Sequence, residues 1–193
     1  MRRKFILTDE TRKFNGGTQY RIKAVRDFGD VKKGQLGGFV EHEYQLDHNG
    51  KCWLYDNASI VGETGCVMEN AKVYDTAIIC NSYISGNAEI RGHYNWIRDA
   101  CITSDARIEN WRDYVVLHGI VPFPRLYNEV DIMTFFKCSH NIIRVKYAHG
   151  HGHTVNQFKN RMIQLYEKED PRYVDEILAL VNLINIHFHK NNS

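Results

Sequence analysis

The chain lacks an excess of charge of either sign. Its 193 residues carry 25 basic and 23 acidic side chains, which gives a formal net charge of +2. Nucleic acids and anionic membranes attract strongly basic proteins, and mimics of nucleic acid are strongly acidic. The composition therefore gives no reason to expect a nucleic-acid partner, mimicry of one, or a membrane surface as partner.

Paired cysteine motifs and long apolar runs are also missing. The five cysteines are odd in number and never occur as C-x-x-C. Several fall inside the repeats described below, where a small thiol can fill a core position, so a reduced compartment is expected. Residues 1–4 are followed by only three apolar residues, too few for a signal peptide, and no run is long enough to cross a bilayer. We therefore expect a cytoplasmic protein.

The sequence does contain a six-residue pulse from Leu54 to about Ile120, in which an aliphatic residue is followed four positions later by a small one. The pairs are Leu54 with Ala58, Val67 with Ala71, Val73 with Ala77, Ile84 with Ala88, Ile102 with Ala106, and Trp96, in the aliphatic position, with Ala100. Anchors recur every six residues at Ile84, Ile90, Trp96, Ile102, Ile108, Tyr114 and Ile120. Self-similarity at a fixed period is typical of a solenoid. The pulse predicts a short left-handed parallel β-helix over residues 51–121.

The segment before the pulse, residues 1–50, predicts a β-rich cap. Residues 4–7 and 20–25 read as two strands of a hairpin, and Asn15-Gly16-Gly17 supplies its turn, because glycine accepts the positive φ of tight turns. Residues 27–30 and 33–40 are punctuated by glycine, so we expect turns there that feed the first coil.

The segment after the pulse, residues 122–193, begins at Pro122-Phe123-Pro124 and predicts a ββαα module. Residues 132–136 and 142–147 read as an antiparallel pair, Thr154 can cap a first helix, and Asp170-Pro171 starts a second. The expected apolar faces are Val155, Phe158, Met162, Leu165 and Tyr166, then Val174, Ile177, Leu178, Val181 and Ile184. The predicted fold is mainly β, a short β-helix with an N-terminal hairpin cap and a C-terminal α+β module.

Three stretches carry a family resemblance: YRIKAVRDFGDVKKG at residues 20–34, LGGFV at 36–40 and CWLYDNA at 52–58. They resemble a family of phage and prophage proteins with left-handed β-helix bodies of hexapeptide-like repeats, mostly without an assigned function. The resemblance covers residues 5–120 and, more weakly, the C-terminal module. It implies the β-helix and an origin in a mobile element of a bacterial host.

The resemblance and the lack of a recognisable catalytic constellation predict a non-catalytic binding protein in the cytoplasm of a bacterial host cell. A counter-defence role is its sharpest form. The partner would be a host immune complex, such as a CRISPR effector, or a small nucleotide signal. No cofactor is expected.

The alternative is an enzyme, because hexapeptide β-helices are best known as acyltransferases with a catalytic histidine near a cleft between subunits. His93 and His118 lie in the repeat region, and either could take a proton from an acceptor hydroxyl or amine.

Large side chains interrupt the repeats and predict a contact surface. Aromatic and arginine side chains are enriched at interface hot spots. The candidate binding or interface residues are Arg91, Tyr94, Trp96, Arg98, Trp111 and Arg112. A homo-oligomer, dimer or trimer, is the expected use of this surface, although the rings could instead fill the end of a coil under a cap.

One dense histidine cluster, His149-Gly150-His151-Gly152-His153, precedes the first helix, and His140 could lie near it across the hairpin. Imidazoles two residues apart in an extended segment point to the same side, so two of them could hold a metal. Further ligands with a suitable spacing are missing, so the sequence favours a polar loop and no metal site.

Overall fold

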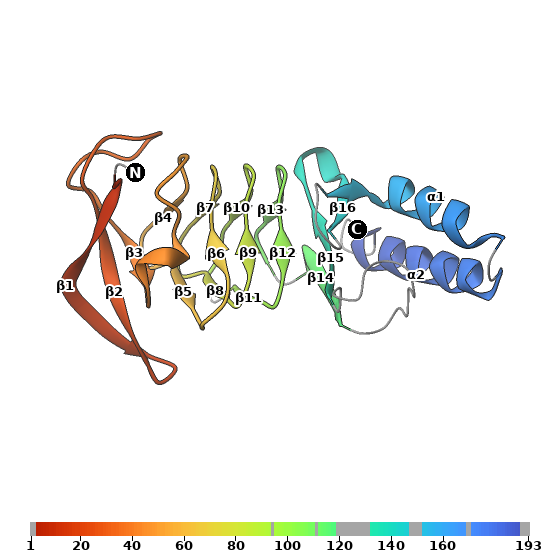
Figure 1. Cartoon of the computed structure of the whole chain (residues 1–193), viewed down its shortest axis with the longest axis horizontal. Helices are drawn as coiled ribbons and strands as arrows, with labels where there is room; N and C mark the ends of the chain where they lie inside the picture. Colours follow the sequence, from red (N-terminus) through yellow and green to blue (C-terminus); the bar gives the residue numbers. More distant parts are fainter. Residues whose placement is uncertain are drawn as a thin grey trace.

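The computed structural model describes residues 3–93, 95–110, 112–118, 132–146, 152–168 and 171–189. An N-terminal hairpin, a stack of coils and a pair of helices follow one another along the long axis of the molecule (Figure 1). Among these residues no helix is long and apolar enough to cross a membrane.

Short parallel strands form the coils and confirm the predicted β-helix. They are β4 (Trp53–Leu54), β5 (Ser59–Val61), β6 (Cys66–Val67), β7 (Lys72–Val73), β8 (Ile78–Cys80), β9 (Tyr83–Ile84), β10 (Glu89–Ile90), β11 (Trp96–Arg98), β12 (Cys101–Ile102) and β13 (Arg107–Ile108). Strands three apart pair in parallel and build three faces, with the orders β4-β7-β10-β13, β6-β9-β12 and β5-β8-β11.

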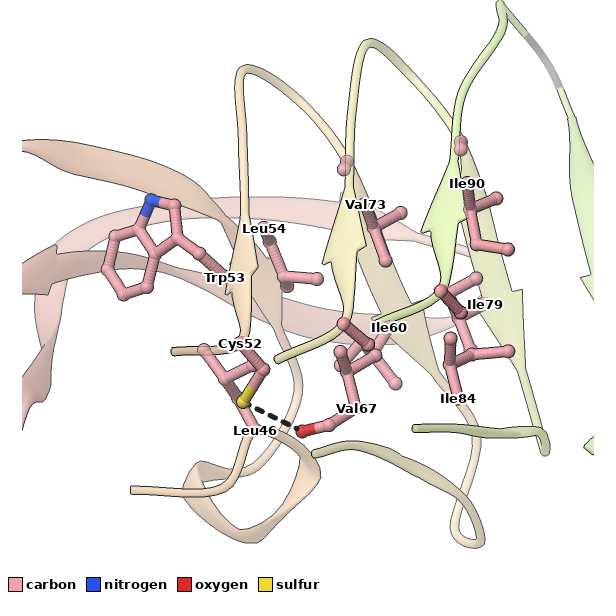
Figure 2. Packing of buried hydrophobic residues seen from close by; sticks show 14 of the residues in the cluster. Leu46, Cys52, Trp53, Leu54, Ile60, Val67, Val73, Ile79, Ile84 and Ile90 are labelled. Atoms are coloured by element: carbon pink, nitrogen blue, oxygen red, sulfur yellow. Dashed lines mark hydrogen bonds between the residues drawn. The ribbon is translucent and has the colours of Figure 1, made fainter. Parts of the chain in front are cut away.

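The core is a set of inward-pointing columns. Leu54, Val73, Ile90 and Ile108 stack on one face at intervals of 19, 17 and 18 residues, and each is fully buried. Figure 2 shows the first three of these residues in line, with Ile60, Ile79, Val67 and Ile84 on the neighbouring faces. Intervals near 18 residues confirm three hexads per coil.

The prediction that Trp96 fills an inward position is wrong. Ile97 is fully buried there, stacked in register on Ile79, whereas Trp96 faces outward and is 39% exposed. Seven residues separate Ile90 from Ile97, and five separate Ile97 from Ile102. The two intervals together equal two hexads, but Ile97 lies one residue later than a strict period of six predicts. An indole is too large for a column built from isoleucine side chains.

The N-terminal cap is a hairpin of β1 (Phe5–Phe14) and β2 (Gly17–Ala24). Asn15 and Gly16 turn it with φ of 49° and 84°, as a two-residue hairpin turn requires. The prediction of turns over residues 33–40 is wrong for most of this segment. Residues Leu36–Val40 form strand β3, which pairs antiparallel with β2 and parallel with β5. Positions 37 and 38 of this strand require glycine. A Cβ at Gly37 would collide with the Trp53 side chain, and a Cβ at Gly38 would collide with the Ala58 backbone. A short 3₁₀ turn, η1 (Glu43–Gln45), follows.

The C-terminal module has a four-stranded antiparallel sheet and two helices. Its elements are β14 (Tyr114–His118), β15 (Ile132–Lys137), the 3₁₀ turn η2 (Ser139–Asn141), β16 (Ile143–Lys146), β17 (His153–Thr154), α1 (Val155–Tyr166) and α2 (Pro171–His189). The predicted strand pair and both helices are confirmed, and Thr154 caps α1 in a capping box with Gln157. Tyr114, predicted as a coil anchor, begins β14 instead, while the last predicted anchor, Ile120, lies outside the described residues.

Strand β15 separates two cores. Met133 and Phe135 pack with the helices, whereas Phe136 and Cys138 pack against the last coil. Both helices lie on the side of this sheet away from the coils (Figure 1). Leu165 and Leu178, predicted on buried faces, are 45% and 43% exposed because the α1–α2 contact uses neighbouring helical positions.

Candidate functional site

His93 lies exposed in the turn between β10 and β11. Gly92 before it has a φ of 107°, and a Cβ there would lie 2.6 Å from the carbonyl oxygen of Glu109 in the next coil. The Gly92 N–H donates to a carboxylate oxygen of Asp75 at 2.8 Å. The contacts of Gly92 with both neighbouring coils therefore fix the backbone that carries His93.

The imidazole of His93 faces Thr76, which occupies the same turn one coil earlier. Nδ1 of His93 and Oγ1 of Thr76 are 3.4 Å apart. When Nδ1 carries the proton and donates to Thr76, the lone pair of Nε2 is available to accept a proton. Sequence reasoning selected His93 but missed Thr76 and Asp75. Their offset of 17 residues from His93 and Gly92, about one coil, was the signal that could have found them.

His118, the other candidate base, is the last residue of β14 and its backbone pairs with Ile132. The prediction placed it in the repeats, but β14 belongs to the antiparallel sheet because it pairs with β15.

Of the predicted contact residues that the structure describes, only two lie on the same strand. Trp96 and Arg98 do lie together on β11, where the Arg98 guanidinium carbon is 5.2 Å from the Trp96 ring centroid. Phe14 of the hairpin lies 6.1 Å from the same ring, and the Tyr114 hydroxyl donates to the Trp96 carbonyl at 2.9 Å.

Arg91 lies on another face, because it follows β10 rather than β11. Arg112 lies in the turn before β14, where its carbonyl oxygen is 3.1 Å from Nε2 of His187. Tyr94 and Trp111, the other two predicted residues, lie outside the described residues.

Arg91 ends an aromatic ladder that sequence reasoning missed. Its guanidinium carbon lies 3.9 Å from the Tyr74 ring centroid, and Tyr74 stacks on Tyr55 at 4.4 Å. The Tyr55 hydroxyl donates to Asp30 at 2.7 Å, and Lys72 also binds Asp30 at 2.9 Å. Burial and the Asp30 carboxylate raise the pKa of Tyr55. The ladder joins the N-terminal cap to the coils.

A polar pocket of about 570 Å³ lies between the last coil and η2. Its lining includes Arg107, Asp113, Lys137 and His140. His140 and Asn141 both have a φ of 58°, a conformation that non-glycine residues rarely adopt and that is enriched at functional sites.

The predicted histidine cluster is described only from Gly152 onward, and His149 and His151 lie outside the described residues. Burial and three nearby cations, Arg161, Lys146 and Arg144, lower the pKa of His153. No three His, Cys, Asp or Glu side chains in the described part of the chain could together hold a metal ion.

No family model matches the chain. The chain is 32% identical over 85 residues to the "Uncharacterized acetyltransferase YdcK" of Escherichia coli (strain K12). The aligned region covers 40% of this chain and 26% of that protein, so the chain spans about a quarter of its relative. The similarity to a protein named as an acetyltransferase, together with the parallel coils, fits a left-handed β-helix of the hexapeptide-repeat type.

Proposed function

We propose that this chain is an acyltransferase of the hexapeptide-repeat type and that His93 is its general base. The observation that carries the proposal is the 32% identity over 85 residues to a protein named as an acetyltransferase. This similarity supports acyl transfer above the non-catalytic binding role that the sequence alone favoured. Counter-defence and a host partner stay predictions.

The substrates would be an acyl thioester and an acceptor that carries a hydroxyl or an amine. Nε2 of His93 removes the proton from the acceptor as its oxygen or nitrogen attacks the thioester carbonyl. The carbon–sulfur bond breaks, and the thiolate that leaves takes the proton from the imidazolium. The products are an ester or amide and a free thiol, and His93 returns to its neutral form.

Thr76 and Gly92 would act as positioning residues in this reaction. In this reaction Nδ1 of His93 would donate to the hydroxyl of Thr76, 3.4 Å away, and Nε2 would be the basic nitrogen. The hydrogen bond from Gly92 to Asp75 holds the turn that presents the ring.

Release of free thiol from an acetyl thioester, measured with a panel of hydroxyl and amine acceptors, tests the proposal. His93→Ala should lower kcat/KM by about 10²–10⁴-fold, the usual contribution of a general base. His42→Ala is a matched control, because His42 is also exposed but lies beside Tyr44 near η1. Its activity should equal that of the wild type.

Full activity of the His93→Ala variant, or no transfer by the wild type to any acceptor, would contradict the proposal. Thr76→Val should lower kcat and leave KM for the thioester unchanged, because it removes the hydroxyl that orients the His93 ring.

A further inference from the structure

A buried lysine and a buried thiol lie side by side at the N-terminal end of the β-helix. Lys4 directly precedes β1, Cys52 directly precedes β4, and both side chains are fully buried. Nζ of Lys4 lies 3.0 Å from Sγ of Cys52. Figure 2 shows Cys52 beside Trp53, with its sulfur directed at the carbonyl oxygen of Val67, 3.4 Å away.

The hydrogen-bond partners of Lys4 determine how the N–H groups and the lone pair of its Nζ are oriented. Nζ donates to the carbonyl oxygen of Cys52 at 2.9 Å and to that of Asn49 at 3.2 Å. An ammonium group would also donate its third N–H to the sulfur. A neutral amine makes the same two hydrogen bonds to carbonyls and turns its lone pair toward the sulfur.

The burial of this pair favours the neutral amine. Removal from water lowers the pKa of Lys4, whereas the smaller effects of Cys52 and Asp47, and the Phe28 ring 5.2 Å from Nζ, act in the opposite direction. Burial likewise raises the pKa of Cys52. A neutral amine is a nucleophile, whereas an ammonium ion has no lone pair to react.

We propose that Lys4 and Cys52 form an oxidative modification site, at which hydrogen peroxide joins Nζ covalently to Sγ. The neutral amine takes the thiol proton as the sulfur attacks the peroxide; the O–O bond breaks, and the proton passes to the departing hydroxide, which gives a sulfenic acid and water. The nitrogen lone pair then attacks the sulfur, the S–O bond breaks, and the hydroxide leaves with a proton from nitrogen as a second water. One peroxide is reduced, and the pair loses two hydrogens to become a sulfenamide.

The link would tie the start of β1 to the first coil across 48 residues of sequence. A covalent link between distant residues restricts the unfolded chain, and the native contact of 3.0 Å requires little movement to form the bond. Peroxide is small enough to reach the pair during local opening of the chain end. The linked protein should melt about 10 °C higher than the reduced one.

Mass spectrometry of the full chain, treated with hydrogen peroxide and digested without reductant, tests the proposal. The expected product is a peptide pair joined through Lys4 and Cys52, lighter than the sum of the two peptides by about 2 Da. Dithiothreitol should separate the pair and restore the original Tm. A pair heavier by about 14 Da would carry one added oxygen, either between nitrogen and sulfur or on the sulfur, and it would also support a covalent Lys4–Cys52 link.

The other thiols supply the controls. Cys66 and Cys101 are partly exposed, so their oxidation shows that the peroxide was active. Cys80→Ala removes another buried thiol and should keep the link, whereas Cys52→Ala and Lys4→Met should abolish it. If Cys66 and Cys101 are oxidised while Cys52 stays reduced, or becomes a sulfinic acid beside a free Lys4 amine, the proposal is wrong. This result in the wild-type chain decides the matter even if a variant fails to fold.

Discussion

A small residue stands two positions before each inward-pointing aliphatic residue of the coils except Leu46, which follows the exposed Tyr44, and the coil corners depend on it. Gly38, Cys52, Ala58, Gly65, Ala71, Ala77, Ser82, Ala88, Asn95, Ala100 and Ala106 all hold this position and are all buried. Where the small residue is polar, its side chain can bind nearby backbone. Ser82, for example, donates to the Cys80 carbonyl at 2.8 Å and accepts from the Ala100 N–H at 3.0 Å. The corners therefore tolerate several residue types but not large ones.

Gly65→Ala should destabilise the protein more than Gly34→Ala. Both glycines have a positive φ, of 100° and 88°, so both variants place alanine in an unfavourable backbone conformation that costs about 1 kcal/mol. A Cβ at Gly65 would also lie 2.4 Å from the Ser82 backbone nitrogen in the next coil, whereas nothing lies within 4 Å at Gly34. We expect an additional loss of about 2 kcal/mol at Gly65, measured by urea unfolding. If the two variants lost the same unfolding free energy, the neighbouring coil would be able to move away from the added Cβ at Gly65, and the prediction would be wrong.

At the scale of elements, η2 and β15 close the C-terminal end of the β-helix. Ala106 bridges to Cys138, and the Lys137 N–H donates to the Asp113 carbonyl at 2.8 Å. Ser139 donates from its backbone N–H to the Asp105 carbonyl and from its hydroxyl to the Asp105 carboxylate. These bonds satisfy backbone groups that a β-helix otherwise leaves unpaired at its end.

The Asp105 carboxylate should make this junction sensitive to acid. The hydrogen bond from Ser139 lowers the pKa of Asp105, so its contribution to stability is present above the unfolded value of about 4 and is lost as the pH falls through the lower folded value. Asp105→Asn should therefore lower Tm at pH 7 and approach the wild-type Tm in acid. Because the carboxylate is partly exposed and screened by solvent, the effect should stay below about 1 kcal/mol.

Ser139→Ala keeps the charge of Asp105 but removes the hydroxyl donor that lowers its pKa. Its Tm should therefore also fall below that of the wild type at pH 7 and approach the wild-type Tm in acid. Melting curves from neutral to strongly acidic pH provide the measurement. A Tm difference between wild type and Asp105→Asn that stays constant with pH would mean that the carboxylate gives no titrating contribution.

At the scale of the whole molecule, both ends of the coil stack are covered, and part of one side is covered too. The β-hairpin extends one sheet at the N-terminal end, and Phe14 packs against Val61, Ile78 and Cys80 on the outside of that sheet. Trp96 borders this apolar strip and remains 39% exposed. An exposed indole with an arginine stacked on it is a frequent centre of protein contacts.

We expect the protein to be a dimer or trimer in solution through the surface of Trp96 and Arg98. Trp96→Ala should shift the mass measured by light scattering toward the monomer, because truncation of a buried aromatic anchor costs about 2 kcal/mol or more. Tyr83→Ala is the matched control, since Tyr83 is 49% exposed on the face of β9. A wild-type monomer at micromolar concentration would refute this expectation.

The sequence by itself determined the coils, because their packing is local and periodic. Each coil from Leu54 to Ile108 packs an aliphatic residue at its inward positions and a small residue two places earlier. Because this packing repeats, the pulse was sufficient to predict the coils. The hairpin turn at Asn15-Gly16 and the cap of Thr154 on α1 are also local, and both were predicted.

Only the tertiary structure decided which residues meet across coils and caps. Whether Trp96 or Ile97 points inward depends on the register against Ile79, and a shift of one residue exchanges the two faces of a strand. The contacts of His93 with Thr76, of Tyr55 with Tyr74, and of Lys4 with Cys52 join residues 17, 19 and 48 positions apart. Such contacts depend on the length of each coil and on the path of the cap, which the spacing of aliphatic residues along the chain leaves open.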